Sequence, residues 1–504
     1  MTNRLRAVRL CRNISTGARI NVFLRGRKKK NMAIIDDINK WLANKNIAQI
    51  LCFLADWIDG HAPQIYLVYA LPLILFLSLA MPPLSAPDEW DHTARALNIA
   101  QGHMAPSVSK DGKLVSSLGQ NYQAVVLDSH AALWKNHRWS WAPFMSHLDD
   151  PWGDSFLPAN YASQGYFPLG YVPQIIFLCA ARMAKWPIVS SLRWGRLFMG
   201  ALYCLGAAAL LAWARSARVA LLMVLGCPLS LFLFASFSPD PLILLLTTFI
   251  AIGLARYWNQ SRIPRHTVFL VLLAAFVICS LKIVYLPVFM LLLVGFRKAI
   301  FKSPATALFA GGAIFAALSW NAIYVQPPDR LAAGIDPAAQ LHFLMADPLV
   351  VFPVAMHTLE VTKLKFLFDW FNFTKVHWPE LSPSVIVIML SGMALIFIMD
   401  PLRVAYSKKE AGSWSFASVL LTTGLSFAAL YLAWTKVGSM GAVQGFQGRY
   451  LLPLLPLLLL TAGLLPSWPQ ARQAVLCLVT PLWLAGCAVI TVWIATSYVL
   501  PYYP

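Results

Sequence analysis

The sequence predicts an all-α integral membrane protein with about 11 transmembrane helices, within a range of about 10 to 13. Two observations lead to this fold class. Of the 504 residues, 59% are apolar and only 12% are charged, a balance typical of chains that lie mostly in lipid. Apolar runs long enough to cross a bilayer also recur along the chain. Neither a soluble enzyme nor a disordered protein has this composition.

The apolar runs give the expected position of each transmembrane helix. They are 63–82, 191–213, 217–237, 240–258, 266–281, 283–296, 304–325, 384–399, 415–434, 449–466 and 474–499. The run 283–296 is shorter than the others. The segment 166–186 is ambiguous because Pro168, Pro173 and Arg182 interrupt it. This segment either crosses the membrane or lies at its surface.

Positive charge sets the expected orientation. The chain has 40 Lys and Arg against 21 Asp and Glu, a formal net charge of +19. If the segment 166–186 does not cross, the basic clusters between later helices all fall on the side of the basic N-terminus, whereas a crossing puts them on the opposite side. Because Lys and Arg accumulate in cytoplasmic loops, we prefer the first arrangement, with a cytoplasmic N-terminus. The excess charge suits contact with membrane lipids, and no nucleic acid partner is expected. Met32 follows the basic run, so translation could start at Met1 or at Met32.

This topology divides the chain into four parts. Residues 1–62 are expected to form a basic cytoplasmic tail and an interfacial helix. Residues 63–325 form an N-terminal membrane core, which includes a long first outer loop, 83–190, that carries the acidic site. Residues 326–383 are rich in Pro and aromatic side chains and are expected to be an outer loop of interfacial helices or a lid. Residues 384–504 form the C-terminal transmembrane helices.

The densest group of polar residues follows the first predicted span and ends at Arg95. A helix over this stretch would place Asp88, His92 and Arg95 on one face, at i, i+4 and i+7. Asp88 or the neighbouring Glu89 could then take a proton from an incoming hydroxyl group. His92 and Arg95 would hold an anionic leaving group such as a phosphate. Acidic residues are also favoured at a helix N-terminus by the helix dipole, which would explain Asp88 and Glu89 without any chemistry.

Three more charged residues lie at the ends of predicted spans. Asp240 stands between two apolar runs, where a carboxylate is costly unless it has a function, although a simple turn could also explain it. Lys282 interrupts an apolar stretch, and Arg449 opens another. Either cation could simply reach for lipid headgroups. Gly448 beside Arg449, however, allows close approach of the backbone, which suits binding of a lipid-linked phosphate.

The order of these motifs resembles a bacterial family of multi-pass membrane proteins catalogued as domain of unknown function 2142, whose members look like membrane glycosyltransferases of the GT-C superfamily. The resemblance covers roughly Leu71 to Leu460. Its motifs are Pro87-Asp88-Glu89 with His92, Arg95 and Gln101-Gly102, then Tyr166 to Gln174, Arg196-Leu197, Ser236 to Asp240, Lys282 with Tyr285-Leu286-Pro287, and Gln447 to Pro453.

The resemblance implies a GT-C-like enzyme of the bacterial cytoplasmic (inner) membrane. Such an enzyme transfers a sugar from a polyprenyl-phosphate donor, usually with inversion, to a cell-envelope glycan, lipid or protein acceptor on the outer face. The family's catalytic base or metal contact corresponds to Asp88 or Glu89, and a second acid corresponds to Asp240. If Mg or Mn takes part, these three carboxylates are its expected ligands. The expected substrate-binding residues are Asp91, His92, Arg95, Lys282, Arg449 and Tyr450.

Two other functions stay open at this point. A transporter or flippase of lipid-linked saccharides would share the multi-pass topology. It would place charges deep inside spans and usually contains internal repeats, which the sequence lacks. A non-enzymatic subunit of a polysaccharide assembly complex would tolerate replacement of Asp88 and Asp240 by alanine. Soluble nucleotide donors are not expected, because the sequence contains no P-loop and no GxGxxG motif after a strand.

Overall fold

The computed structural model describes residues 45–109, 114–130, 141–325, 334–362, 365–373, 381–404 and 407–499. The chain divides into two compact units, Met1–Phe53 and Leu54–Pro504. From the first unit, the described residues belong to the beginning of helix α3 (Lys45–Gly60). The predicted basic tail and the choice of start codon therefore fall outside the described residues. All further elements belong to the second unit.

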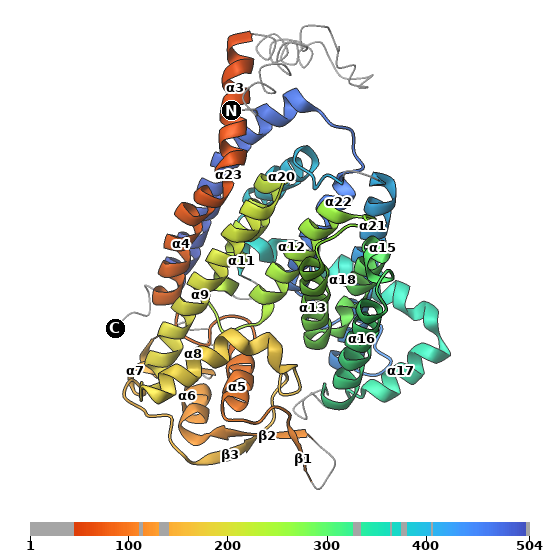
Figure 1. Cartoon of the computed structure of the whole chain (residues 1–504). Coiled ribbons are helices and arrows are strands. Elements are labelled where there is room, and N and C mark those ends of the chain that lie inside the picture. The colour runs from red at the N-terminus through yellow and green to blue at the C-terminus, as the bar shows by residue number, and fades with distance from the viewer. Residues whose placement is uncertain are drawn as a thin grey trace. The chain divides into compact units, whose positions relative to one another are not determined.

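Among the described residues, six helices are long and apolar enough to cross a membrane. They are α4 (Ala62–Ala80), α9 (Ile188–Trp213), α12 (Asp240–Tyr257), α16 (Pro304–Tyr324), α21 (Lys408–Trp434) and α23 (Pro469–Val499). Each coincides with a predicted apolar run, and α4 packs against both α9 and α23 (Figure 1). The chain is therefore a helical multi-pass membrane protein, as the composition predicts.

The predicted number of about 11 spans is not confirmed by helix length. Four other apolar stretches form helical segments of 10 to 17 residues. They are α13 (Arg265–Leu281), η4 (Ile283–Tyr285) with α14 (Leu286–Gly295), α20 (Pro383–Met399), and η6 (Gly448–Tyr450) and η7 (Leu452–Leu454) with α22 (Leu455–Ala462). Even a 17-residue helix is only about 26 Å long, short of the ~30 Å hydrocarbon core. Hydropathy shows which runs are buried, but it does not show where their helices end.

The predicted span 217–237 is divided in two. Helix α10 (Arg218–Gly226) ends before Cys227, whose ψ is 153°, and α11 (Pro228–Phe234) begins at the next residue. The ring of Pro228 disfavours helical backbone at the preceding residue, which accounts for the break. Nearly every residue of the two helices is buried, and both helices pack against α4 and α9. This run therefore forms the centre of the protein core.

The segment 326–383 is largely helical where the structure describes it. Helix α17 (Pro337–Ala346) is followed by η5 (Pro348–Val350) and α18 (Val351–Thr362), with a bend of 105° between the two halves. By length and composition this pair could be a broken span or a re-entrant loop. If it counts as one span, the described residues contain up to 7 elements long enough to cross a membrane. The next helix, α19 (Lys365–Asn372), packs against α11 and η6.

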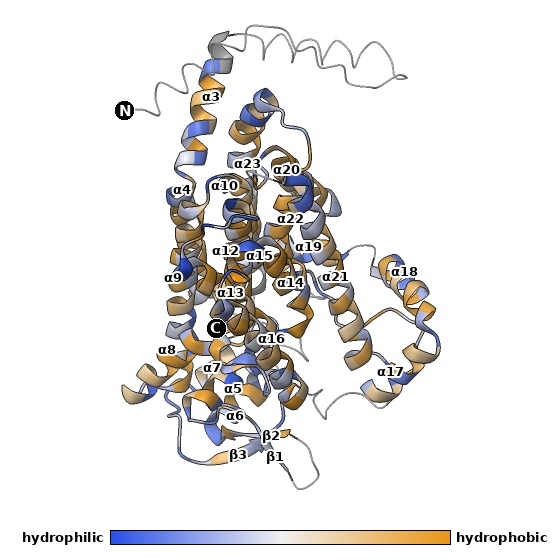
Figure 2. Ribbon diagram, turned by 45° about the vertical axis from the view of Figure 1, so that its right-hand side comes forward, coloured by the Kyte–Doolittle hydropathy of each residue, from blue (hydrophilic) through white to orange (hydrophobic). Residues whose placement is uncertain are grey.

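The predicted first outer loop, 83–190, folds into short helices and a small sheet. Its helices are α5 (Glu89–Ala100), α6 (Gln120–His130), α7 (Ala142–Met145), the 3₁₀ helix η3 (Pro168–Tyr171) and α8 (Val172–Met183). Strands β1 (Ser107–Val108), β2 (Leu114–Gly119) and β3 (Phe156–Ala159) pair antiparallel in that order. Ser107 lies opposite Val115, and Ser116 lies opposite Ala159. The all-α prediction did not include this sheet. In Figure 2, hydrophilic colour is frequent around α5, α6 and the sheet, whereas the long helices are mainly hydrophobic.

The ambiguous segment 166–186 forms η3 and the 12-residue helix α8. Twelve residues of helix extend about 18 Å, too little to cross a ~30 Å hydrocarbon core. Helix α8 packs against α5 and α9. This length suits the arrangement in which the segment does not cross, while the cytoplasmic position of the N-terminus stays a prediction.

Candidate functional site

Four breaks in the helical structure come together to form the candidate site. Asp88 directly precedes α5, and Asp240 is the first residue of α12, where the helix dipole stabilises a carboxylate. Lys282 follows α13 with an extended backbone (φ −141°), and Arg449 lies in the 3₁₀ turn η6. Because each residue lies where a helix begins or ends, side chains separated by as many as 361 positions meet.

The four charged side chains alternate in sign. Lys282 Nζ lies 2.6 Å from Asp240 Oδ1, and Arg449 Nη1 lies 3.6 Å from Asp240 Oδ2. Arg449 Nη2 also forms an ion pair with the Asp88 carboxylate. The side chain of Asp88 is 50% exposed, whereas those of Asp240 and Arg449 are 5% and 2% exposed. Asp88 is therefore the only one of these four through which solvent reaches the cluster freely.

Tyr450 holds the two cations side by side. Lys282 Nζ lies 5.2 Å and Arg449 Cζ 5.1 Å from the centre of its ring, within the range of cation–π attraction. The Tyr450 hydroxyl accepts a hydrogen bond from Arg449 Nη2 at 3.2 Å. The backbone of this turn is fixed from the other side, because Tyr285 Oη donates to the Tyr450 carbonyl at 3.1 Å.

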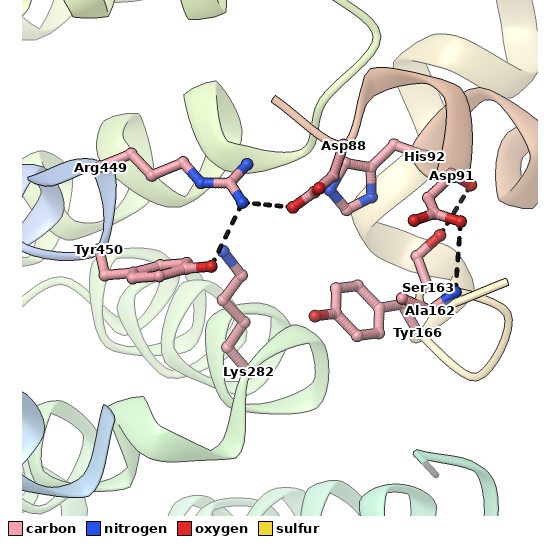
Figure 3. A pocket seen from close by; sticks show the side chains of 9 residues that line it. All are labelled: Asp88, Asp91, His92, Ala162, Ser163, Tyr166, Lys282, Arg449 and Tyr450. Carbon is pink, nitrogen blue, oxygen red and sulfur yellow. Dashed lines mark hydrogen bonds and ion pairs between the residues drawn. The ribbon is translucent and has the colours of Figure 1, made fainter. Parts of the chain in front are cut away.

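A small cavity of about 50 Å³ opens beside this cluster (Figure 3). The residues that line it are Asp88, Asp91, His92, Ala162, Ser163, Tyr166, Lys282, Arg449 and Tyr450. Lys282, Arg449 and Tyr450 form one wall. Carboxylate, imidazole and hydroxyl groups from α5 and the segment before η3 face them across the cavity. A cavity needs roughly 10–15 Å³ of such volume to hold one water molecule. The space therefore fits a few waters or a phosphoryl group.

The wall opposite the cations is held together by hydrogen bonds. Asp91 Oδ1 accepts from the Ala162 amide at 3.2 Å, and Ser163 Oγ donates to the Asp91 carbonyl at 2.7 Å. His92 Nδ1 and the Tyr171 hydroxyl are 2.8 Å apart. All these contacts lie inside the predicted first outer loop, and the largest separation in sequence is 79 positions. This wall is therefore formed by a single region of the chain.

Burial and neighbouring charges set the ionisation of Asp88 and His92. Partial desolvation alone would raise the pKa of Asp88, but the guanidinium of Arg449 outweighs it and holds that pKa below its ordinary value. Burial lowers the pKa of His92 to about 4, against the opposing influence of Asp240 and Asp88. At neutral pH Asp88 is therefore a carboxylate and His92 a neutral imidazole. A neutral His92 could hold a phosphate through a hydrogen bond but not through a positive charge.

Glu89, the other candidate for the catalytic base, does not line the cavity. Its Oε2 accepts from the Ala86 amide at 3.0 Å, and its Oε1 accepts from the Phe237 amide at 3.1 Å. Arg196 Nε lies 3.4 Å from Oε1, and neither side chain of this pair is exposed. Asp88 precedes α5 with a left-handed backbone and Glu89 is the first residue of the helix, so the two side chains point in different directions. Glu89 joins two loops of the core, and of the two adjacent acids only Asp88 faces the cavity.

Arg95 likewise lies outside the cavity. Its Nε donates to the Tyr166 carbonyl at 2.8 Å and its Nη2 donates to the Met104 carbonyl at 2.7 Å. The side chain is completely buried. Arg95 therefore positions the segment that carries Tyr166, and the expectation that it binds substrate directly is corrected.

Sequence patterns missed Asp369, which controls the turn that carries Arg449. Asp369 Oδ2 accepts from the Gly448 amide at 2.7 Å, and Trp370 Nε1 donates to the Gly448 carbonyl at 2.9 Å. A Cβ atom on Gly448 would lie 2.0 Å from the Phe366 carbonyl oxygen, so only glycine fits. The glycine was visible in the sequence, but nothing there indicated that its partner is α19.

The predicted metal ligands are not assembled as a set. Asp88 and Asp240 each bind cationic side chains, and Glu89 is occupied by backbone amides and Arg196. Across the part of the chain that the structure describes, no three His, Cys, Asp or Glu side chains are grouped as a metal site requires. These residues do not fit Mg or Mn as a resident ion.

Comparison with known proteins places this site within a family. Residues 71–458 match the family described as "Predicted membrane protein (DUF2142)". No curated protein and no solved structure matches the chain. The matched region includes all four charged residues of the cluster and confirms the predicted membership of the family of unknown function 2142. Since it covers well over half of the 504 residues, the chain belongs to the DUF2142 family of predicted membrane proteins.

Proposed function

We propose that the protein is a membrane glycosyltransferase that moves a sugar from a polyprenyl-phosphate-linked donor to an acceptor of the cell envelope. The observation that carries this proposal is the cavity in which the half-exposed carboxylate of Asp88 faces Lys282 and Arg449. The adjacent Asp240 begins a helix of membrane length. The cavity therefore adjoins the end of a candidate span, which is the level at which a lipid presents its headgroup.

The charged groups suit a single displacement. The acceptor hydroxyl oxygen attacks the anomeric carbon, and the bond from that carbon to the phosphate oxygen breaks. The electron pair of that bond leaves with the polyprenyl phosphate, and the hydroxyl proton passes to Asp88 as general base. Lys282 and Arg449 stabilise the negative charge that develops on the leaving phosphate. One such displacement inverts the configuration of the anomeric carbon.

The wall opposite the cations supports a sugar ligand. Asp91, Ser163 and Tyr166 carry oxygen atoms that can exchange hydrogen bonds with sugar hydroxyls. His92 is neutral and its ring lies 5.8 Å from that of Tyr166, so the wall also has apolar surface for a sugar ring. A phosphate on the cationic wall would place the attached sugar against these groups.

The finer topology belongs to the same proposal. A GT-C-like arrangement of about 11 membrane segments would include the shorter apolar helices as tilted or broken spans. The N-terminus would lie in the cytoplasm and the cavity at the outer face of a bacterial cytoplasmic membrane. The separation of basic clusters from the site supports this orientation, because Lys and Arg accumulate in cytoplasmic loops.

Release of polyprenyl phosphate tests the proposal. Purified protein in nanodiscs would be given polyprenyl-phosphate hexoses and candidate acceptors, with wild type compared against Asp88→Asn and Glu89→Gln. We expect Asp88→Asn to reduce turnover by at least about 100-fold, the size of a lost general base. Glu89→Gln should retain turnover per folded molecule, because Glu89 does not touch the cavity.

Two results would overturn this function. Movement of the intact lipid-linked saccharide across the membrane, without cleavage, would indicate a flippase. Normal glycan production in cells that carry Asp88→Ala and Asp240→Ala would indicate a subunit without enzymatic activity. Equal turnover in wild type and Asp88→Asn would remove Asp88 as the base while leaving the transferase activity in place.

A further inference from the structure

The guanidinium of Arg449 is already bonded to several groups of the protein. Its Nη1 donates to the Pro87 carbonyl at 3.0 Å, and its Nη2 contacts both Asp88 and the Tyr450 hydroxyl. Its Nε is buried and has no hydrogen-bond partner among the residues that the structure describes. The guanidinium thus keeps one unused donor, and of its two acidic partners Asp88 is the more exposed.

The two carboxylates that contact Arg449 are not equally anchored. Asp240 is buried and also accepts a hydrogen bond from Lys282 at 2.6 Å. The Asp88 side chain is half exposed and makes no hydrogen bond to the amides of α5, although Asp is a favoured capping residue at this position. Its backbone is left-handed (φ 55°), which is uncommon for residues other than glycine. Of the two, Asp88 is therefore the one that an incoming group can displace.

Charge and space favour such a displacement. The cluster holds two carboxylates and two cations, so an additional phosphate would leave it with excess negative charge. A phosphoryl group that approaches Lys282 and Arg449 through the cavity also meets the Asp88 carboxylate, which lines the same space. A phosphate and the Asp88 carboxylate would both be negative, and two like charges inside one small cavity repel each other.

We propose that the Asp88–Arg449 ion pair is the closed state of this site, which the phosphoryl group of a prenyl lipid opens by replacing Asp88 on the guanidinium. Asp88 then leaves the cationic wall and becomes free to accept the proton of the acceptor hydroxyl. The second step rests on the proposed transferase function, whereas the exchange of one anion for another does not. The base would be released only when the donor phosphate is in place.

Binding of a short prenyl phosphate tests the exchange. Farnesyl phosphate would be titrated into the full-length protein in nanodiscs of uncharged lipid. If Asp88 competes with the phosphate, Asp88→Asn should bind it about five- to tenfold more tightly than wild type. Arg449→Lys should bind more weakly, because it loses the planar pair of donors.

The matched control is Asp91→Asn, which removes a carboxylate from the same cavity. Asp91 accepts a hydrogen bond from the Ala162 amide on the wall opposite Arg449, and its proposed role is toward the sugar, which farnesyl phosphate lacks. General reduction of negative charge would act through both variants, whereas competition for Arg449 acts through Asp88 alone. We therefore expect less than about a twofold change for Asp91→Asn. Equal tightening by both variants, or no tightening by Asp88→Asn, would overturn the exchange.

Further arms separate the possible sources of phosphate and confirm folding. Inorganic phosphate and nanodiscs that contain phosphatidylglycerol would replace farnesyl phosphate; a prenyl lipid site predicts the Asp88→Asn effect to be largest for farnesyl phosphate. An equal effect for all three would mean a general anion site and would overturn the assignment to a prenyl lipid.

Asp88→Ala repeats the test if Asp88→Asn elutes as aggregate. Tighter binding without any sugar transfer would retain the exchange and reject the transferase, whereas transfer without tighter binding would do the reverse.

Discussion

Glu89 and Arg196 form a completely buried ion pair, with Arg196 Nε 3.4 Å from Glu89 Oε1. Arg196 also donates to the carbonyls of Ala235 and Met81, at 2.6 and 2.7 Å. Glu89 accepts from the amide of Phe237. Together the two side chains join the end of α4, the start of α5 and the loop before α12. The position of Asp88 beside the cavity therefore depends on a pair that does not touch the cavity.

Removal of either partner of this pair should destabilise the protein. We expect Glu89→Ala and Arg196→Ala each to cost about 3–5 kcal/mol, because each leaves a buried charge unpaired. The double variant should cost less than the sum of the two. Thermal unfolding in detergent, followed by tryptophan fluorescence, measures these differences. If Glu89→Gln unfolded like wild type yet lost turnover, Glu89 would belong with the catalytic groups instead.

Gly448→Ala should displace the turn that carries Arg449. The new Cβ would lie 2.0 Å from the Phe366 carbonyl oxygen, a backbone atom that cannot rotate away. We expect a loss of stability of about 1–3 kcal/mol from overpacking and a marked loss of farnesyl phosphate binding. Gly311→Ala is the matched control, since nothing lies within 4 Å of its added Cβ in α16. Unchanged phosphate binding in Gly448→Ala would show that the turn tolerates a shift of Arg449.

Asp369 should make stability depend on pH. Burial raises its pKa to about 7, against the opposing hydrogen bond from Gly448 and the charge of Arg449. The folded state therefore holds a proton that the unfolded state releases near pH 4. Its contribution to stability is present at low pH and is lost as pH rises through about 7, with a slope of up to about 1.4 kcal/mol per pH unit.

The variant Asp369→Asn checks this assignment. An amide keeps an acceptor for the Gly448 amide but does not ionise. We expect the unfolding temperature of wild type to fall relative to that of Asp369→Asn between about pH 4 and pH 7 and to change little above that. Parallel curves for the two proteins would mean that Asp369 does not titrate in this range.

The positions of the helices followed from composition more readily than their lengths did. Burial in lipid or in a helical core requires continuous apolar sequence, so nearly every apolar run became helical. Length depends on single residues, such as Pro228, which divides one run into two buried helices. The strands of the 83–190 region escaped notice because polar and apolar residues in short strands give a weak pattern beside long hydrophobic runs.

The charged part of the site was predictable for a related reason. Ionised residues at the ends of apolar runs are costly without partners, and this alone singled out Asp240, Lys282 and Arg449. The distinction between Asp88 and Glu89 was not predictable, because it depends on the direction of adjacent side chains at the start of α5. The sequence also did not indicate the role of Asp369 or of the cavity wall opposite the cations. The partners of these residues are backbone groups and neutral side chains that are distant in sequence.

Lys282 and Asp240 allow structural and functional roles to be separated. Lys282→Met leaves Asp240 with only the 3.6 Å contact to Arg449 and should cost about 3–5 kcal/mol. The double variant Lys282→Met/Asp240→Asn removes both charges, so we expect it to recover most of that stability. Farnesyl phosphate binding should stay weak in the double variant, because one cation of the binding wall is still missing. Thermal unfolding and phosphate titration on the same preparations distinguish the two effects. If binding recovered together with stability, Lys282 would serve only to neutralise Asp240, and Arg449 alone would hold the phosphate.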